Sequence, residues 1–112
     1  MYKKKAFLIC LCLCLLTACN GSSSDYETLI GVVKEIDIDN KKILVISGLK
    51  NEDLHEDSNV LIESKKYKDV LWVTGTDPAM FTVGEEIEIV YNSIEDSYPG
   101  QVTAKKINRL DR

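Results

Sequence analysis

The sequence predicts a mainly β fold, and three observations support this prediction. Short runs rich in Val and Ile recur along the chain, separated by Gly, Pro, Asn and Asp residues. One run, residues 86–91 (EIEIVY), alternates acidic and apolar side chains, as expected for a half-buried antiparallel strand. The chain is also short, and a small domain buries only about 60–65% of its unfolded surface, which favours a closed or well-covered sheet.

Five strands are expected, at residues 29–38, 42–47, 69–74, 86–91 and 101–107. The first contains Gly31, where a long strand would bend or bulge. Residues 39–41 (DNK) are typical of a turn, so the first two strands should form a hairpin. Gly75 and the Asp77-Pro78 step end the third strand.

The segments between these strands are less regular. Residues 48–58 are polar and predict a loop with one short helical turn, whereas residues 59–68 fit either a helix or an irregular strand. Residues 97–100 (SYPG) contain Pro followed by Gly, an order that favours a type II turn. Ile107 is out of step with the apolar residues before it, which indicates a bulge near residues 105–106.

A long, bent first strand followed by four more strands is typical of a small Greek-key barrel of the OB type. Closure into a barrel would also remove exposed sheet edges. We therefore predict a five-stranded OB-like β-barrel domain over residues 28–112. The alternatives are an open β-sandwich and a meander with a covering helix.

The N-terminal segment has a different composition from the rest of the chain. Lys3, Lys4 and Lys5 precede eleven apolar residues, 6–16, which is the pattern of a secretory signal peptide. This run is too short to span a bilayer, which needs about 20 apolar residues. Three cysteines in the run fit an apolar segment as small hydrophobes better than they fit a metal site; they are Cys10, Cys12 and Cys14.

The sequence Leu16-Thr17-Ala18-Cys19 ends this run and resembles the lipobox of bacterial lipoproteins. The resemblance implies cleavage before Cys19 and a diacylglyceryl group on its thiol, whose two acyl chains make stable membrane attachment. The chain then divides into a signal peptide (1–18), a lipidated cysteine with a flexible tether (19–27) and the β domain (28–112). The alternative is an ordinary cleavable signal peptide in which Cys19 is incidental.

Removal of residues 1–18 changes the charge and the cysteine count. Residues 19–112 contain 11 basic and 18 acidic residues, a net charge of −7, and Cys19 is their only cysteine. A nucleic-acid partner is therefore not expected, because such a chain repels phosphate. The cluster Lys65, Lys66 and Lys68 is interpreted as a solvated face, with contact to anionic headgroups or wall polymers as the alternative. We expect a monomer without disulfides or cofactors.

Three aromatic residues are the candidates for partner binding: Trp72, Phe81 and Tyr98. Trp72 lies in the middle of an expected strand and is interpreted mainly as a core residue. Tyr98 stands beside the Pro-Gly turn, where we expect it at an exposed rim. Phe81 belongs to the loop that begins at Asp77.

No catalytic, metal-binding or cofactor-binding residue is predicted. His55 is the only histidine and lies in an acidic stretch without apparent catalytic or zinc-binding partners. The stretch Asp37-Ile38-Asp39-Asn40 superficially resembles a calcium loop, but an EF-hand needs Gly at its sixth position and Glu at its twelfth. Lys42 and Gly48 occupy those positions. Weak calcium binding by this turn or by residues 52–57 stays an alternative.

A family resemblance covers residues 29–107. The lipobox is followed by four short segments, of which the last is the most specific: Gly31-Val32-Val33, Ile43-Leu44-Val45, Val83-Gly84-Glu85-Glu86-Ile87 and Ser97-Tyr98-Pro99-Gly100-Gln101. Together they resemble the YobA-like lipoproteins of Gram-positive bacteria, which are built on a domain of unknown function. The resemblance implies an OB-like barrel and a membrane-anchored, outward-facing location. It implies no activity and no catalytic residue.

Two functions fit these observations. The first is a non-catalytic binding module at the extracytoplasmic face of the cell membrane, which recognises a protein or wall-glycan partner through loops around Tyr98 and residues 77–81. The second is a protective or inhibitory lipoprotein whose acidic surface captures a cationic toxin, peptide or enzyme. An enzyme is not expected, because the sequence places no pair of catalytic carboxylates by spacing.

Overall fold

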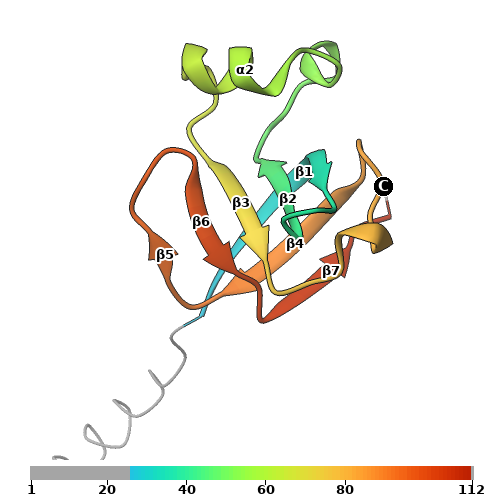
Figure 1. Cartoon of the computed structure of the whole chain (residues 1–112), viewed down its shortest axis with the longest axis vertical. Coiled ribbons are helices and arrows are strands. Elements are labelled where there is room, and N and C mark those ends of the chain that lie inside the picture. The colour runs from blue at the N-terminus through green and yellow to red at the C-terminus, as the bar shows by residue number, and fades with distance from the viewer. Residues whose placement is uncertain (1–25, 112) are drawn as a thin grey trace, which may run out of the picture.

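The computed structural model describes residues 26–111, so the predicted signal peptide and Cys19 lie outside the described residues. The described chain forms one seven-stranded mixed sheet (Figure 1). The strands are β1 (Glu27–Asp37), β2 (Lys42–Ile46), β3 (Val70–Thr74), β4 (Glu86–Tyr91), β5 (Ile94–Glu95), β6 (Gly100–Thr103) and β7 (Lys106–Arg109). Their order in the sheet is β5-β6-β3-β2-β1-β4-β7, with β3 and β6 parallel and the other neighbours antiparallel. The mainly β prediction is confirmed.

The predicted closed barrel of five strands is wrong. Strand pairing does not close the sheet, and the expected last strand, 101–107, is divided into β6, which pairs with β3, and β7, which pairs with β4. Only Ala104 and Lys105, here called the crossing, link these two strands. The amide of Ala104 donates to the carbonyl of Thr74 (2.9 Å), and that of Lys105 donates to the carbonyl of Val90 (2.7 Å). The chain therefore passes from pairing with β3 to pairing with β4 between two adjacent residues. The amides of both residues remain hydrogen-bonded.

The type II turn predicted at residues 97–100 is also wrong. The peptide bond between Tyr98 and Pro99 is cis, and Gly100 is the first residue of β6 without a positive φ. Glycine fits this position by packing: a Cβ here would lie 2.9 Å from Ile94 Cδ1 and 3.0 Å from Leu71 Cδ2, so these side chains would have to shift. Ile94 belongs to β5, a strand absent from the sequence prediction, which pairs with β6.

The irregularity of β1 lies three residues beyond the predicted position. The register between β1 and β2 shifts between Val33 and Glu35, so Lys34 is the extra residue of the bulge. Gly31 has another role. A Cβ at Gly31 would lie 2.7 Å from Val45 Cγ1 and 3.0 Å from the carbonyl of Ile46, so the glycine permits close approach of β1 and β2.

Two apolar clusters lie on opposite faces of the sheet. The inner core consists of residues from β1, β2, β3, β4 and β6: Val33, Ile43, Val45, Leu71, Val73, Ile87, Ile89, Tyr91 and Val102. The outer core lies over β2 and β3 and consists of Leu44, Ile46, Leu61, Tyr67 and Val70. Both faces of β2 are therefore covered, which explains its continuous apolar sequence.

The outer core is covered by the segment between β2 and β3, residues 48–69, here called the α2 lobe (Figure 1). It contains the short helices η2 (Asn51–Asp53) and α2 (Ser58–Ser64). The ambiguous region is thus partly helical, because the Asp57 carboxylate caps α2 by accepting from the amides of Asn59 and Val60. Leu61 then faces the outer core, and Lys65 ends the helix with φ of 56°.

Candidate binding site

The outer face of β3 and β6 presents an aromatic ring among polar side chains. The parallel register places Trp72 of β3 beside Gln101 of β6, and Thr74 beside Thr103. These four side chains, here called the β3–β6 strip, point away from the inner core, since the residues that alternate with them are buried. Trp72 itself is half-buried against the outer core and keeps part of its ring at the surface.

A shallow hollow of about 420 Å³ adjoins the strip. Its lining combines Thr74, Gln101 and Thr103 of the strip with residues 92–95, which connect β4 to β5 and form β5. The hydroxyl groups of Thr74 and Thr103 lie 3.2 Å apart, and that of Thr74 also donates to the carbonyl of Val102 (3.3 Å). The result is a small surface rich in hydroxyl and amide groups, in the size range of small-molecule sites.

One cation contacts the aromatic ring of the strip. Lys42 Nζ lies 4.4 Å from the centroid of the Trp72 ring, within the range of a cation–π interaction. Lys42 precedes Ile43, and Ile43 pairs with Val73, so its position follows from the β2–β3 register. The lysine side chain is long and flexible, and it can turn from the ring towards a ligand.

Tyr98, predicted at an exposed rim, is half-buried and holds the α2 lobe. Its ring packs against the outer core, and its hydroxyl group donates to the backbone carbonyl of Tyr67 (2.7 Å). Burial raises the pKa of the Tyr98 hydroxyl. Lys65 Nζ lies 5.9 Å from the centroid of the Tyr98 ring. These contacts connect the loop before β6 to the lobe.

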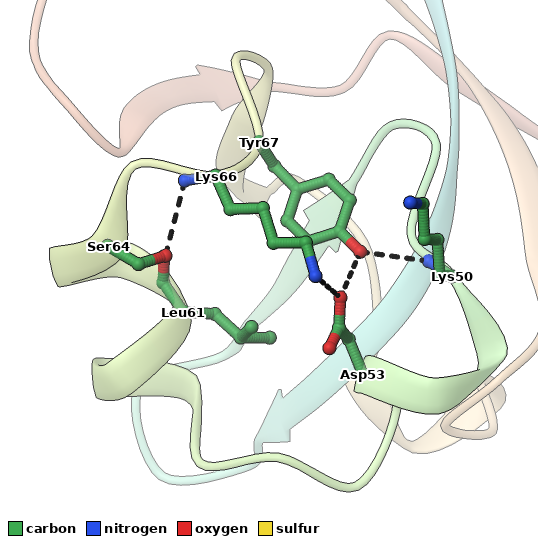
Figure 2. Close-up of polar contacts among 6 residues, drawn as sticks. All are labelled: Lys50, Asp53, Leu61, Ser64, Lys66 and Tyr67. Carbon is green, nitrogen blue, oxygen red and sulfur yellow. Dashed lines mark hydrogen bonds and ion pairs between the residues drawn. The ribbon is translucent and has the colours of Figure 1, made fainter.

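Three side chains and one backbone amide link the two ends of the α2 lobe (Figure 2). The Tyr67 hydroxyl donates to the Asp53 carboxylate and accepts from the amide of Lys50 (3.1 Å). Lys66 Nζ lies 2.8 Å from Asp53 Oδ2. We call Lys50, Asp53, Lys66 and Tyr67 the lobe lock, because they join the segment before α2 to the segment after it.

The hydrogen bonds of the lobe lock shift the pKa values of its members. Lys66, and after it Tyr67, lower the pKa of the Asp53 carboxyl group by hydrogen bonding to its ionised form. The same contact with Asp53 raises the pKa of Lys66. Burial, followed by the hydrogen bond to Asp53, raises the pKa of Tyr67. The lock thus stabilises the lobe, and Asp53, Lys66 and Tyr67 each favour the protonation state that bonds to its neighbours.

Phe81 lies in a different part of the molecule from Tyr98. It follows η3 (Pro78–Met80) and packs against the inner core. The guanidinium group of Arg109 lies 5.1 Å from the Phe81 ring, donates to the carbonyl of Met80 and pairs with Glu85 (Nε to Oε2, 2.5 Å). The structure therefore does not bring Tyr98 and residues 77–81 into one surface.

The other polar features of the sequence do not assemble into a site within residues 26–111. His55 is exposed in the α2 lobe. The Asp37 carboxylate accepts from the amide (3.2 Å) and the side chain (2.9 Å) of Asn40, and these bonds lower its pKa. Over this same range there is no group of three or more His, Cys, Asp or Glu side chains placed to hold a metal ion. Nor do the helices of the described chain include one that is long and apolar enough to cross a membrane.

Sequence reasoning found Trp72 but missed its neighbours. Thr74, Gln101 and Thr103 are polar residues in short strands, and nothing local distinguishes them from other surface residues. Only the parallel pairing of β3 with β6 brings them together. The alternation of Gln101 and Thr103 with buried Gly100 and Val102 is the one signal that indicates their shared face.

The fold and the strip define a small mainly β domain with an open polar face and one aromatic ring at its surface. Residues 31–111 match the family described as "protein of unknown function (DUF3221)", and the chain belongs to this family. Comparison with curated proteins yields no significant match.

Two solved structures of YobA from Bacillus subtilis are similar to this chain. A solution NMR structure of YobA residues 21–120 has 21% sequence identity and a TM-score of 0.62, over 80% of this chain and 84% of that chain. A crystal structure of a YobA protein has 21% identity and a TM-score of 0.61, over 76% of this chain and 95% of that chain. At this identity the likeness shows a shared fold, and the resemblance to YobA-like proteins is confirmed.

Proposed function

We propose that this protein is a lipid-anchored, extracytoplasmic and non-catalytic binding module that recognises a wall glycan through the β3–β6 strip. The observation that carries the proposal is the Trp72 ring at the surface, with Gln101 and Thr103 beside it on the same face. The apolar face of a sugar ring packs against an aromatic ring of this kind, while amide and hydroxyl groups hydrogen-bond to its hydroxyl groups.

The electrostatics of the chain favour a ligand without strong positive or negative charge. A net charge of −7 over residues 19–112 repels polyanions, and the strip itself contains no ionised side chain. Lys42 at the Trp72 ring and Glu95 at the hollow supply one charge of each sign near the strip. A largely neutral glycan meets no net repulsion at such a surface.

Tryptophan fluorescence tests this proposal directly, because Trp72 is the only tryptophan of the chain. Soluble glycan-strand fragments released from cell wall by a muramidase would be titrated into the mature protein. We expect a saturable change in emission. Gln101→Ala should weaken binding by up to about tenfold, since a neutral hydrogen bond contributes about 0.5–1.5 kcal/mol.

Asn59→Ala is the matched control for this titration, because Asn59 is an exposed amide on α2, on the part of the molecule that covers the outer core. Its titration should equal that of the wild type. A flat emission signal throughout the titration, or equal affinities for Gln101→Ala and wild type, would overturn the assignment of the ligand to the strip.

The anchor is tested separately in cells. We expect the protein to incorporate labelled palmitate and to sediment with membranes, because a diacylglyceryl group on Cys19 holds it there. Cys19→Ala should lose both the label and the membrane association. Wild-type protein recovered unlabelled from the medium would contradict the anchor and leave the glycan titration unaffected.

Capture of a cationic toxin, peptide or enzyme is the alternative. Glu52, Glu56 and Asp57 are exposed in the α2 lobe and favour it, but Lys65 and Lys66 lie in the same lobe and lower its net negative charge. Salt separates the two functions. Binding of a cation by exposed carboxylates should weaken strongly at high ionic strength, whereas glycan binding should change little.

A further inference from the structure

We infer that the crossing and the adjacent η3 turn form the surface on which the anchored domain rests against an anionic bilayer. This inference rests on the proposed acylation of Cys19 and adds an orientation to it. Three observations support it: where the tether joins the sheet, which charges surround that place, and which apolar side chain is exposed among them.

The tether joins the sheet close to the crossing. Thr28 of β1 pairs with Val90 of β4, and Val90 pairs with Lys106 of β7. Lys106 therefore lies two strands from Thr28, about 10 Å away. In Figure 1 the start of β1 and the crossing lie at one end of the domain, and the α2 lobe lies at the other.

The length of the tether limits how far this end can move from the membrane. Seven residues, 20–26, separate Cys19 from the first residue of β1. The eight residue steps from Cys19 to Glu27 span at most about 29 Å when the chain is fully extended. The start of β1 therefore stays within about 29 Å of the acylated cysteine, whatever the orientation of the α2 lobe.

The charged side chains that line the pocket at this end are cationic, although the mature chain is acidic. A pocket of about 280 Å³ between the crossing and η3 is lined by Lys105, Lys106 and Arg109 and by no carboxylate. Both lysines are exposed. Glu85 pairs with Arg109 and partly neutralises it, so the two lysines supply most of the positive potential. Glu27 at the start of β1 and Asp77 at the start of η3 are exposed carboxylates that reduce this potential.

An exposed apolar side chain lies beside these cations. Met80 is 58% exposed, and Phe81 next to it is half-buried under Arg109. Cationic groups with an apolar side chain between them fit the boundary between anionic headgroups and acyl chains. A lysine near such a surface strengthens association by about fivefold. The crossing would thus face the membrane and leave the α2 lobe pointing away from it.

Site-specific fluorescence on the acylated mature protein tests this orientation. Because acylation occupies the thiol of Cys19, the mature chain offers no other cysteine, and an introduced one can be labelled uniquely. An environment-sensitive probe would be placed at Met80→Cys and, as control, at Val60→Cys on α2, which is 51% exposed. The protein would be incorporated into vesicles that contain a headgroup-level quencher. One set would be phosphatidylcholine, and the other equal parts of phosphatidylcholine and phosphatidylglycerol.

We expect the probe at position 80 to be quenched severalfold more than the probe at position 60 in the anionic vesicles. The difference should decrease in neutral vesicles and at high salt, because ions screen exposed charges over about 10 Å at 0.1 M. Lys105→Glu with Lys106→Glu should abolish it. The matched control, Lys65→Glu with Lys68→Glu, changes the net charge equally at the other end and should preserve it.

Equal quenching of the two probes in anionic vesicles would overturn the inference, as would loss of the difference in both double variants. These results would leave the anchor intact, because the protein would still float with the vesicles. If wild-type protein acquired no palmitate in cells, the anchor itself would fail, and this orientation would fail with it.

Discussion

The inner core and the outer core are built on the same strands but are held in different ways. The inner core is enclosed by five strands, and its members Ile43, Ile87 and Ile89 are completely buried. The outer core is covered by a single lobe with two short helices, and the polar lobe lock and Tyr98 hold that lobe in place. The sheet is therefore expected to unfold as one unit, whereas the lobe is held by fewer contacts and can open separately.

The largest effect is expected where the inner core is opened. Ile43→Ala removes a completely buried side chain and should lower the free energy of unfolding by about 2–5 kcal/mol. This is a large part of the total of about 5–15 kcal/mol for a domain. Chemical denaturation would measure it. Ile38→Ala, at a side chain that is 56% exposed, is the control and should change stability by no more than about 0.5 kcal/mol. Equal losses would contradict the assignment of Ile43 to the core.

A smaller and more local effect is expected in the outer core. Leu61→Ala removes the main contact of α2 with the sheet, at a side chain that is 4% exposed. The loss should lie near 2 kcal/mol, the low end for such substitutions, because the lobe can settle into the space. Amide hydrogen exchange should accelerate over residues 58–69 and stay slow in β1 and β4. Uniform acceleration would show that the two cores unfold as one unit.

The same contrast explains what could be predicted from the sequence. Strands β1 to β4 can be predicted from local sequence patterns. Strand β2, which is covered on both faces, is continuously apolar, whereas β4, which is covered on one face, alternates polar and apolar residues. The hairpin of β1 and β2 and the short helical turn before α2 were likewise predicted from local sequence.

The remaining features depend on partners distant in the chain. The division of residues 101–107 follows from hydrogen bonds to Thr74 and Val90, which no local pattern reveals. The sequence predicts Gly100 as a turn residue, whereas in the structure it packs closely against Ile94 and Leu71. The candidate site divides in the same way. Trp72 can be identified as a candidate from the sequence because it is the single tryptophan. The polar residues around it come together only through the pairing of β3 with β6.

The smallest effect is expected from pH and should be confined to the α2 lobe. The folded lobe lowers the pKa of Asp53, so the stabilisation from this carboxylate is complete above its unfolded value of about 4 and is lost as the pH falls through the lower folded value. The pKa values of Lys66 and Tyr67 are raised, so their contributions are present below about pH 10 and are lost above it. The lobe should therefore loosen at both extremes. Protection factors over residues 58–69 would detect this at acidic pH, and circular dichroism would detect it at alkaline pH.

Two carboxylate variants separate the lobe lock from a general response to acid. Asp53→Asn should make the protection factors of the lobe, which are corrected for the intrinsic pH dependence of exchange, almost independent of pH in the acidic range, because the titrating group is gone. Asp37→Asn is the matched control. Its carboxylate also has a lowered pKa, but it bonds to Asn40 in the turn between β1 and β2 and has no contact with the lock. The lobe should keep its acid response in this variant. Loss of the acid response in Asp37→Asn, or its persistence in Asp53→Asn, would contradict the assignment of this response to the lobe lock. The opening of the lobe would then depend on the unfolding of the sheet.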